Sequence, residues 1–182
     1  MSRMLVAGMG NVLRQDDGFG VEVARRLMER PALPVAVKVV EVGIGGIHLV
    51  QELMDGYDAL VVIDAVERGS APGTVHLLEA EVADLALWSE SERGDFLADM
   101  HYTTPSKALI LARALGVLPP RVFILGCQPG EAEAPGIGLT APVERAADEA
   151  IRTLHELVGH LDRQIGGSQP VASAAGPRQS DG

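Results

Sequence analysis

The segment that decides the fold is Gly8-Met9-Gly10-Asn11-Val12-Leu13-Arg14-Gln15-Asp16-Asp17-Gly18-Phe19-Gly20. The apolar run Met4 to Ala7 stands directly before it and predicts a β-strand. From about Gly18 to Glu29 a helix is predicted, because apolar residues recur there at a spacing of four. A strand, a glycine-rich turn and a helix in this order are typical of a parallel sheet covered by helices.

The same alternation continues along the chain. Ala59–Val66 is the most apolar run and is expected to be the central strand, buried on both faces. Thr104 is expected to cap a helix that has Pro105 at its first position and stops at Gly116. The remaining expected elements are strands at Val35–Val42, Thr74–Leu78 and Arg121–Cys127, helices at Ile47–Met54 and about Ala141–Ile165, and a weak helix followed by a loop in residues 81–99.

These elements predict an α/β fold, a three-layer sandwich with a mostly parallel, twisted sheet of about five strands and helices on both faces. The strand at 74–78 follows its predecessor after a short turn, so the two are expected to pair antiparallel. Residues 1–165 are expected to form a single domain. Residues 166–182 are rich in Gly, Ser, Ala, Pro and Gln, and a disordered tail is expected there.

The composition narrows the class of partner. The chain has 182 residues, with 15 Lys and Arg against 25 Asp and Glu, and its formal net charge is -10. Nucleic acids and anionic membranes attract basic surfaces, so neither is expected as a partner. No apolar run approaches the roughly 20 residues of a membrane helix, and no targeting segment is recognisable. Cys127 is the single cysteine and cannot form an internal disulfide, so the chain is expected to be cytoplasmic. A monomer is the expected oligomeric state.

The glycine loop departs from a dinucleotide-binding loop. In the pattern G-x-G-x-x-G the third glycine would fall at position 13, where this chain has Leu13. Asp16 and Asp17 would also place negative charge beside a pyrophosphate. One of the two aspartates is expected to cap the following helix, and the other to point into the crevice at the carboxyl ends of the strands.

A metal site is the second hypothesis for this crevice. Asp64 ends the presumed central strand, where a buried carboxylate needs an amide, a cation or a metal as partner. His101 stands in the loop before the helix at Thr104 and is expected at the same end of the sheet. Asp17, Asp64 and His101 together would suit nickel, zinc, manganese or iron. The remaining histidines, His48, His76, His155 and His160, lie in regular elements and show no metal-binding spacing.

Several motifs together resemble the hydrogenase maturation endopeptidases, which process the large subunits of NiFe-hydrogenases. The resemblance runs from about Met4 to the end of the last helix. Around His101 the chain departs from it, since Asp99-Met100 and Tyr102-Thr103-Thr104 flank the histidine where the family often has Ser-x-His followed by Gly and Leu. The residues that carry the resemblance are Gly8-x-Gly10-Asn11-x-Leu13-x-x-Asp16-Asp17-Gly18-x-Gly20, Val62-Ile63-Asp64-Ala65, Leu125-Gly126-x-x-Pro129 and Gly138-Leu139-Thr140.

The resemblance implies a protease domain at residues 1–165 and a nickel-dependent endopeptidase that removes a short C-terminal extension from the nickel-loaded large-subunit precursor. It maps the metal-contacting and catalytic residues onto Asp17, Asp64 and His101, with Gly43 near the site, and the precursor itself would supply the nickel. No Ser or Cys nucleophile beside a base is evident, and Cys127 is expected to be a small buried apolar residue. Two alternatives stay open: a self-sufficient metal-dependent peptidase or amidohydrolase, and a non-catalytic nucleotide-binding Rossmann-like module.

Overall fold

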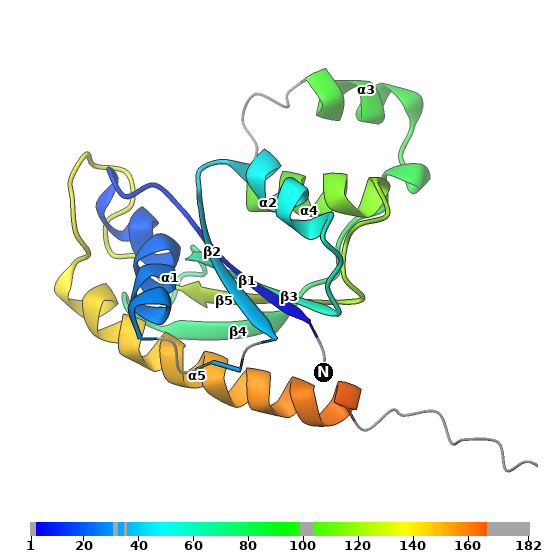
Figure 1. The fold of residues 1–182 in the computed structure, drawn as a ribbon. Helices are drawn as coiled ribbons and strands as arrows, with labels where there is room; N and C mark the ends of the chain where they lie inside the picture. The colour runs from blue at the N-terminus through cyan, green and yellow to red at the C-terminus, as the bar shows by residue number, and fades with distance from the viewer. Residues whose placement is uncertain (1–2, 31–32, 35, 99–103, 167–182) are drawn as a thin grey trace, which may run out of the picture.

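The computed structural model describes residues 3–30, 33–34, 36–98 and 104–166, and these form the expected α/β sandwich (Figure 1). The strands are β1 (Met4–Met9), β2 (Val37–Gly43), β3 (Ala59–Ala65), β4 (Val75–Glu79) and β5 (Arg121–Cys127). The helices are α1 (Phe19–Glu29), α2 (Gly46–Leu53), α3 (Glu90–Ala98), α4 (Pro105–Ala114) and α5 (Ala141–Gly166), with short 3-10 turns at η1 (Gln15–Gly18) and η2 (Leu85–Leu87).

The strand order is β2-β1-β3-β5-β4, and all neighbours are parallel except β4 and β5. The prediction that the strand at 74–78 runs antiparallel is therefore confirmed, but the predicted partner is wrong. β5 pairs with β3 along its whole length, from Ala59 opposite Arg121 to Ala65 opposite Cys127. Because β5 occupies that edge of β3, β4 is left to pair with the outer edge of β5.

This order creates a switch point between β1 and β3. The chain leaves β1, forms β2 on one side of it, and returns to form β3 on the other side. Loops that leave the carboxyl ends of strands at such a point diverge and open a crevice there. The loop after β1 carries Asp17 and the end of β3 carries Asp64, so both aspartates belong to the rim of this crevice.

The helix signals at Thr104 are confirmed, but the prediction for residues 81–99 is wrong in its order. The Thr104 hydroxyl accepts a hydrogen bond from the Lys107 amide at 3.3 Å, Pro105 is the first helical residue, and Gly116 follows the helix with a φ of +71°. Between β4 and α4 the irregular segment with η2 comes first and helix α3 follows. Val35, at the start of the predicted second strand, and residues 167–182 of the predicted tail lie outside the described residues.

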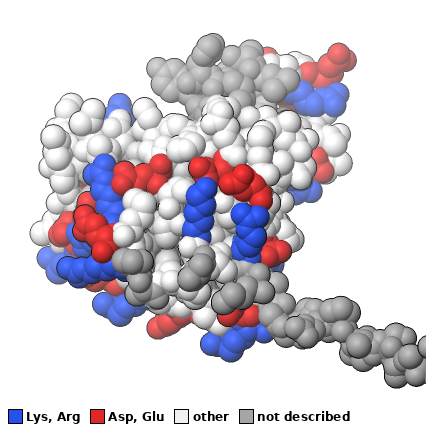
Figure 2. Space-filling view, viewed as in Figure 1, with Lys and Arg blue, Asp and Glu red and all other residues white. Residues whose placement is uncertain are grey.

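Charges of both signs alternate on the face that β2 and α1 present in Figure 2. Lys38 contacts Glu52 at 2.6 Å, and Arg25 contacts Glu41 at 3.1 Å. A basic patch that could bind a polyanion is therefore not formed on this face. None of the helices in the described part of the chain is long and apolar enough to cross a membrane.

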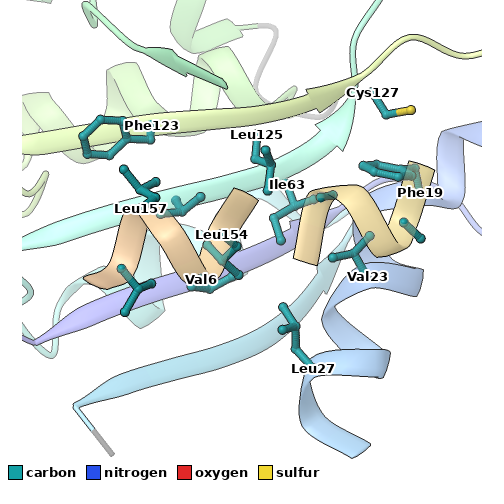
Figure 3. Packing of buried hydrophobic residues seen from close by; sticks show 14 of the residues in the cluster. Val6, Phe19, Val23, Leu27, Ile63, Phe123, Leu125, Cys127, Leu154 and Leu157 are labelled. Carbon is teal, nitrogen blue, oxygen red and sulfur yellow. The ribbon is translucent and has the colours of Figure 1, made fainter. Parts of the chain in front are cut away.

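Each face of the sheet is covered by one helix pair. Val6 and Ile63 point to the side of α1 and α5, where Phe19, Leu154 and Leu157 pack against them (Figure 3). On each of these two strands, the residues that alternate with this set point to the opposite side and pack beneath α2 and α4. Strands β1 and β3 are thus buried on both faces, as expected of a central parallel strand, and their carboxyl ends are held rigidly in place.

Gly20 allows α1 to approach the sheet beside the crevice. A Cβ atom at this position would lie 1.9 Å from the carbonyl oxygen of Ile63 and 2.4 Å from that of Met9. Both contacts are with backbone atoms of central strands, which cannot move away cheaply. We expect Gly20→Ala to lower the free energy of unfolding by about 3 kcal/mol or more, measured by urea denaturation.

Gly94 provides the control for this substitution. It lies inside the exposed helix α3, and an added Cβ atom would meet nothing within 4 Å. Gly94→Ala should therefore stabilise the protein slightly, by up to about 1 kcal/mol, because alanine favours a helix. Equal effects of the two substitutions would contradict a role of Gly20 in close packing.

Candidate active site

A pocket of about 470 Å³ opens at the carboxyl ends of β1, β2 and β3. Asp17 and Asp64 both line it, so the structure brings these two predicted residues together. His101 lies outside the described residues, but Thr104, three positions later, lines the same pocket. The lining residues are Met9, Gly10, Asn11, Arg14, Asp17, Gly43, Ile44, Asp64, Thr104 and Pro105.

A larger hollow of about 590 Å³ lies between α1 and α5. Its most buried charged group is Arg26, which forms ion pairs with Glu22, Glu144 and Asp148. These contacts join the two helices and account for the charges in that hollow. The smaller pocket, which two carboxylates line at the switch point, is the better candidate for chemistry.

Asp17 is held in position by the loop that contains it. The backbone amide of Asn11 donates a hydrogen bond to its Oδ2 at 3.0 Å, and the Asp17 amide donates to the carbonyl of Arg14 at 3.1 Å. Gly10 lies beneath this turn with a φ of +122°, and a Cβ atom there would be 1.8 Å from the Asp17 carbonyl oxygen. Glycine is therefore required at position 10 for the loop to place Asp17 over the end of β1.

Asp64 is partly buried at the end of β3, and its Oδ1 accepts a hydrogen bond from the Ala65 amide at 2.9 Å. Burial raises the pKa of the Asp64 carboxyl to about 7, and the negative charge of Asp17 adds to this rise. The Ala65 amide offsets only part of the effect. Two close carboxylates with so few donors form a site that favours a cation.

Asp16 has a different role from the one that the sequence predicts. Neither aspartate caps α1, whose N-cap is Gly18 and has no side-chain hydrogen bond. The Asp16 carboxylate is fully buried and accepts four hydrogen bonds from the loop between β5 and α5. The donors are the amides of Gly130, Glu131 and Thr140, at 2.8, 2.9 and 2.7 Å, and the Thr140 hydroxyl at 2.8 Å.

These donors keep Asp16 ionised. Burial on its own would raise the pKa of Asp16, but the amides of Glu131, Thr140 and Gly130 hold it below its ordinary value. We call these four hydrogen bonds to the Asp16 carboxylate the Asp16 clamp. The sequence gives no local sign of the clamp, because Asp16 and Thr140 are 124 positions apart. The motif Gly138-Leu139-Thr140 marks the place, and only the folded chain shows what Thr140 contacts.

Among the residues that the structure describes, no Ser or Cys side chain lines this pocket. Cys127 is fully buried, as expected, and burial raises the pKa of its thiol to about 12. The structure does place the Ser70 hydroxyl 3.1 Å from His76 Nε2, a pair that the sequence did not indicate. Neither residue lines the pocket of Asp17 and Asp64. The acids nearest to this pair in sequence have other partners: Glu67 accepts from Gln128 at 2.7 Å and Glu79 accepts from Arg121 at 2.6 Å.

The remaining histidines, which the sequence did not mark as ligands, also lie outside the pocket. His48 is on α2, half exposed and 3.6 Å from Glu52, and His160 contacts Gln164 on the exposed side of α5. Within the part of the chain that the structure describes, no three His, Cys, Asp or Glu side chains form a metal-binding group. Gly43, with a φ of +60°, lines the pocket, as expected of a residue near the site.

Comparison with known proteins agrees with the family that the sequence motifs resemble. Residues 21–157 match a family model described as hydrogenase maturation protease. The hydrogenase expression/formation protein HupD of Rhodobacter capsulatus is 35% identical over 149 residues, which cover 82% of this chain and 68% of HupD. The hydrogenase expression/formation protein HoxM of Azotobacter vinelandii is 34% identical over 155 residues, covering 85% of this chain and 72% of HoxM.

A solved structure shares the fold. The hydrogenase maturating endopeptidase HybD from E. coli aligns with a TM-score of 0.69 and 28% sequence identity. The alignment covers 87% of this chain and 93% of HybD. The sheet, its covering helices and the crevice at the switch point therefore belong to an architecture that is already known.

Proposed function

Because the chain belongs to the hydrogenase maturation protease family, we propose that it removes a short C-terminal extension from the nickel-loaded precursor of a NiFe-hydrogenase large subunit. The observation that carries this proposal is the meeting of Asp17 and Asp64 in one pocket at the switch point. A protease of this family would admit the end of its substrate there, where the strand ends leave backbone and side chains accessible.

The donor set of the pocket fits a divalent cation. Two carboxylate groups line it, and the one at Asp64 has a single hydrogen-bond donor among the described residues. Asp17 and Asp64, with His101 as the third ligand, would complete the coordination of the nickel that the precursor already holds. Carboxylate and imidazole ligands suit nickel, and a shared metal would fix the scissile bond relative to the protein.

The residues around the pocket then have defined roles. The Asn11 amide orients Asp17, the Ala65 amide orients Asp64, and the Asp16 clamp fixes the turn on which Asp17 stands. Nickel in the substrate would polarise the scissile carbonyl or lower the pKa of a water molecule. A water nucleophile agrees with the burial of Cys127 and with the position of Ser70 outside the pocket.

The decisive experiment compares two forms of the precursor. The purified chain is incubated with nickel-loaded and with nickel-free large-subunit precursor, and the products are measured by intact-protein mass spectrometry. We expect a shortened product only from the nickel-loaded form. Equal trimming of both forms, together with a stoichiometric metal in the purified chain, would instead identify a self-sufficient metallopeptidase. No trimming of any candidate precursor would refute the proposed function.

A further inference from the structure

Arg14 is the one basic side chain among the described residues that line the pocket. It stands on the loop between β1 and η1, three residues before Asp17. The whole chain carries a net charge of -10, and the pocket adds two carboxylates close together. An acidic peptide would therefore be repelled from this pocket unless Arg14 met its charge.

The backbone of Arg14 is fixed on both sides. Its amide donates to the carbonyl of Asn11 at 3.0 Å, and its carbonyl accepts from the amide of Asp17 at 3.1 Å. Its two neighbours are joined to the loop before α5: the Gln15 amide donates to the Gly136 carbonyl at 3.0 Å, and the Gly136 amide donates to the Leu13 carbonyl at 2.9 Å. The backbone of Arg14 is therefore fixed relative to that of Asp17, and only the side chain of Arg14 is left to adjust to a ligand.

The guanidinium itself is only weakly engaged. Its ion pair is with Glu133 at 3.8 Å, and the two side chains are 52% and 91% exposed. Exposed pairs at this distance contribute little to stability, so another carboxylate can replace Glu133 at small cost. Arg26 differs in this respect, because its side chain is only 24% exposed and its guanidinium forms ion pairs with three acids.

We propose that Arg14 binds a carboxylate of the precursor segment that enters the pocket, and that it thereby selects precursors with an acidic group near the cleavage site. The inference rests on the proposed function. The planar guanidinium can hold a carboxylate through two parallel hydrogen bonds, which fixes direction as well as distance. The carboxylate is either an acidic side chain of the extension or the terminal carboxylate of the precursor.

Kinetics of the nickel-loaded precursor test this role. We expect Arg14→Gln to raise KM about tenfold and to leave kcat within about twofold, because a ground-state contact to substrate is lost. The KM of Arg14→Lys should lie between the values for wild type and Arg14→Gln, since lysine keeps the positive charge but cannot form the two parallel hydrogen bonds. Glu133→Gln should lower KM, because it frees the guanidinium. The matched control is Arg25→Gln, which removes a charge of similar exposure that contacts Glu41 outside the pocket.

The source of the carboxylate is found by changing the precursor. One set of precursors has the acidic side chains of the extension replaced by their amides, and another ends in a C-terminal amide. The change that makes wild type and Arg14→Gln equal in KM identifies the group that Arg14 binds. A KM for Arg14→Gln equal to that of wild type, or a fall in kcat alone, would overturn the proposal. If wild type trims no precursor, the proposed function fails first, so the two failures are distinguishable.

Discussion

Asp64→Asn is expected to stop processing of the precursor and, at the same time, to make the metal-free protein more stable. The substitution keeps the shape of the side chain and an oxygen that can accept from the Ala65 amide. It removes the negative charge that burial and Asp17 oppose. Processing should fall at least about 100-fold, because groups that merely support a metal ligand already change activity by about 10- to 100-fold.

The gain in stability should depend on pH. In the metal-free protein the pKa of Asp64 is about 7, above its ordinary value of 3.8. Between these two pH values the folded protein retains a proton that the unfolded chain has released, so the contribution of Asp64 to stability falls as pH rises. Each pH unit between these two values costs about 1.4 kcal/mol of stability, so Asp64 should destabilise the fold by roughly 2–3 kcal/mol more at pH 8 than at pH 5.

Urea denaturation of wild type and Asp64→Asn at pH 5 and pH 8 measures this difference. The depressed pKa of Asp16 does not interfere, since the stability that it provides is lost only below its ordinary value of 3.8. Asp95→Asn serves as the control, because Asp95 lies on the exposed surface of α3. If Asp64→Asn gained the same stability at both pH values, the ionised Asp64 carboxylate would not be the source of the destabilisation. Processing by Asp64→Asn at the full wild-type rate would show that Asp64 is not part of the active site.

Asp16→Ala is expected to destabilise the protein strongly, lowering the free energy of unfolding by about 3–5 kcal/mol. The change leaves three backbone amides and the Thr140 hydroxyl without the buried carboxylate that accepts from all of them. The loop before α5 would then keep only its backbone hydrogen bonds to residues 13–16, and the turn that carries Asp17 would be less firmly held. Processing should be lost together with stability, measured by urea denaturation and by the precursor assay.

Thr140→Val tests the same clamp with a milder change. It removes one of the four donors, the hydroxyl at 2.8 Å, and leaves the three amides in place. We expect a loss of about 1–2 kcal/mol and a protein that still folds, with limited proteolysis accelerated in residues 128–140. If Asp16→Ala were as stable as wild type to within about 1 kcal/mol, the carboxylate would not be the anchor of this loop.

The helix that begins at Pro105 and the strand Arg121–Cys127 were predictable, because their signals are local. A cap at Thr104, a proline at the first position and a glycine after the last turn act within one or two turns of the chain. The predicted pairing of the strand at 74–78 failed for the opposite reason. Which edge a strand joins depends on whether another strand already occupies it, and β5 is far away in the sequence.

Local chemistry by itself therefore determined the order of strands and helices, their approximate ends, and the presence of acidic side chains after β1 and β3. Only the tertiary structure decided that Asp16 faces inward to the loop of Thr140 while Asp17 faces the pocket with Asp64. Adjacent side chains in a turn are chemically alike, and what distinguishes them is the distant donors that each one meets. Arg14 lies at the rim of the pocket for a similar reason, because its loop is held by distant backbone hydrogen bonds to Gly136.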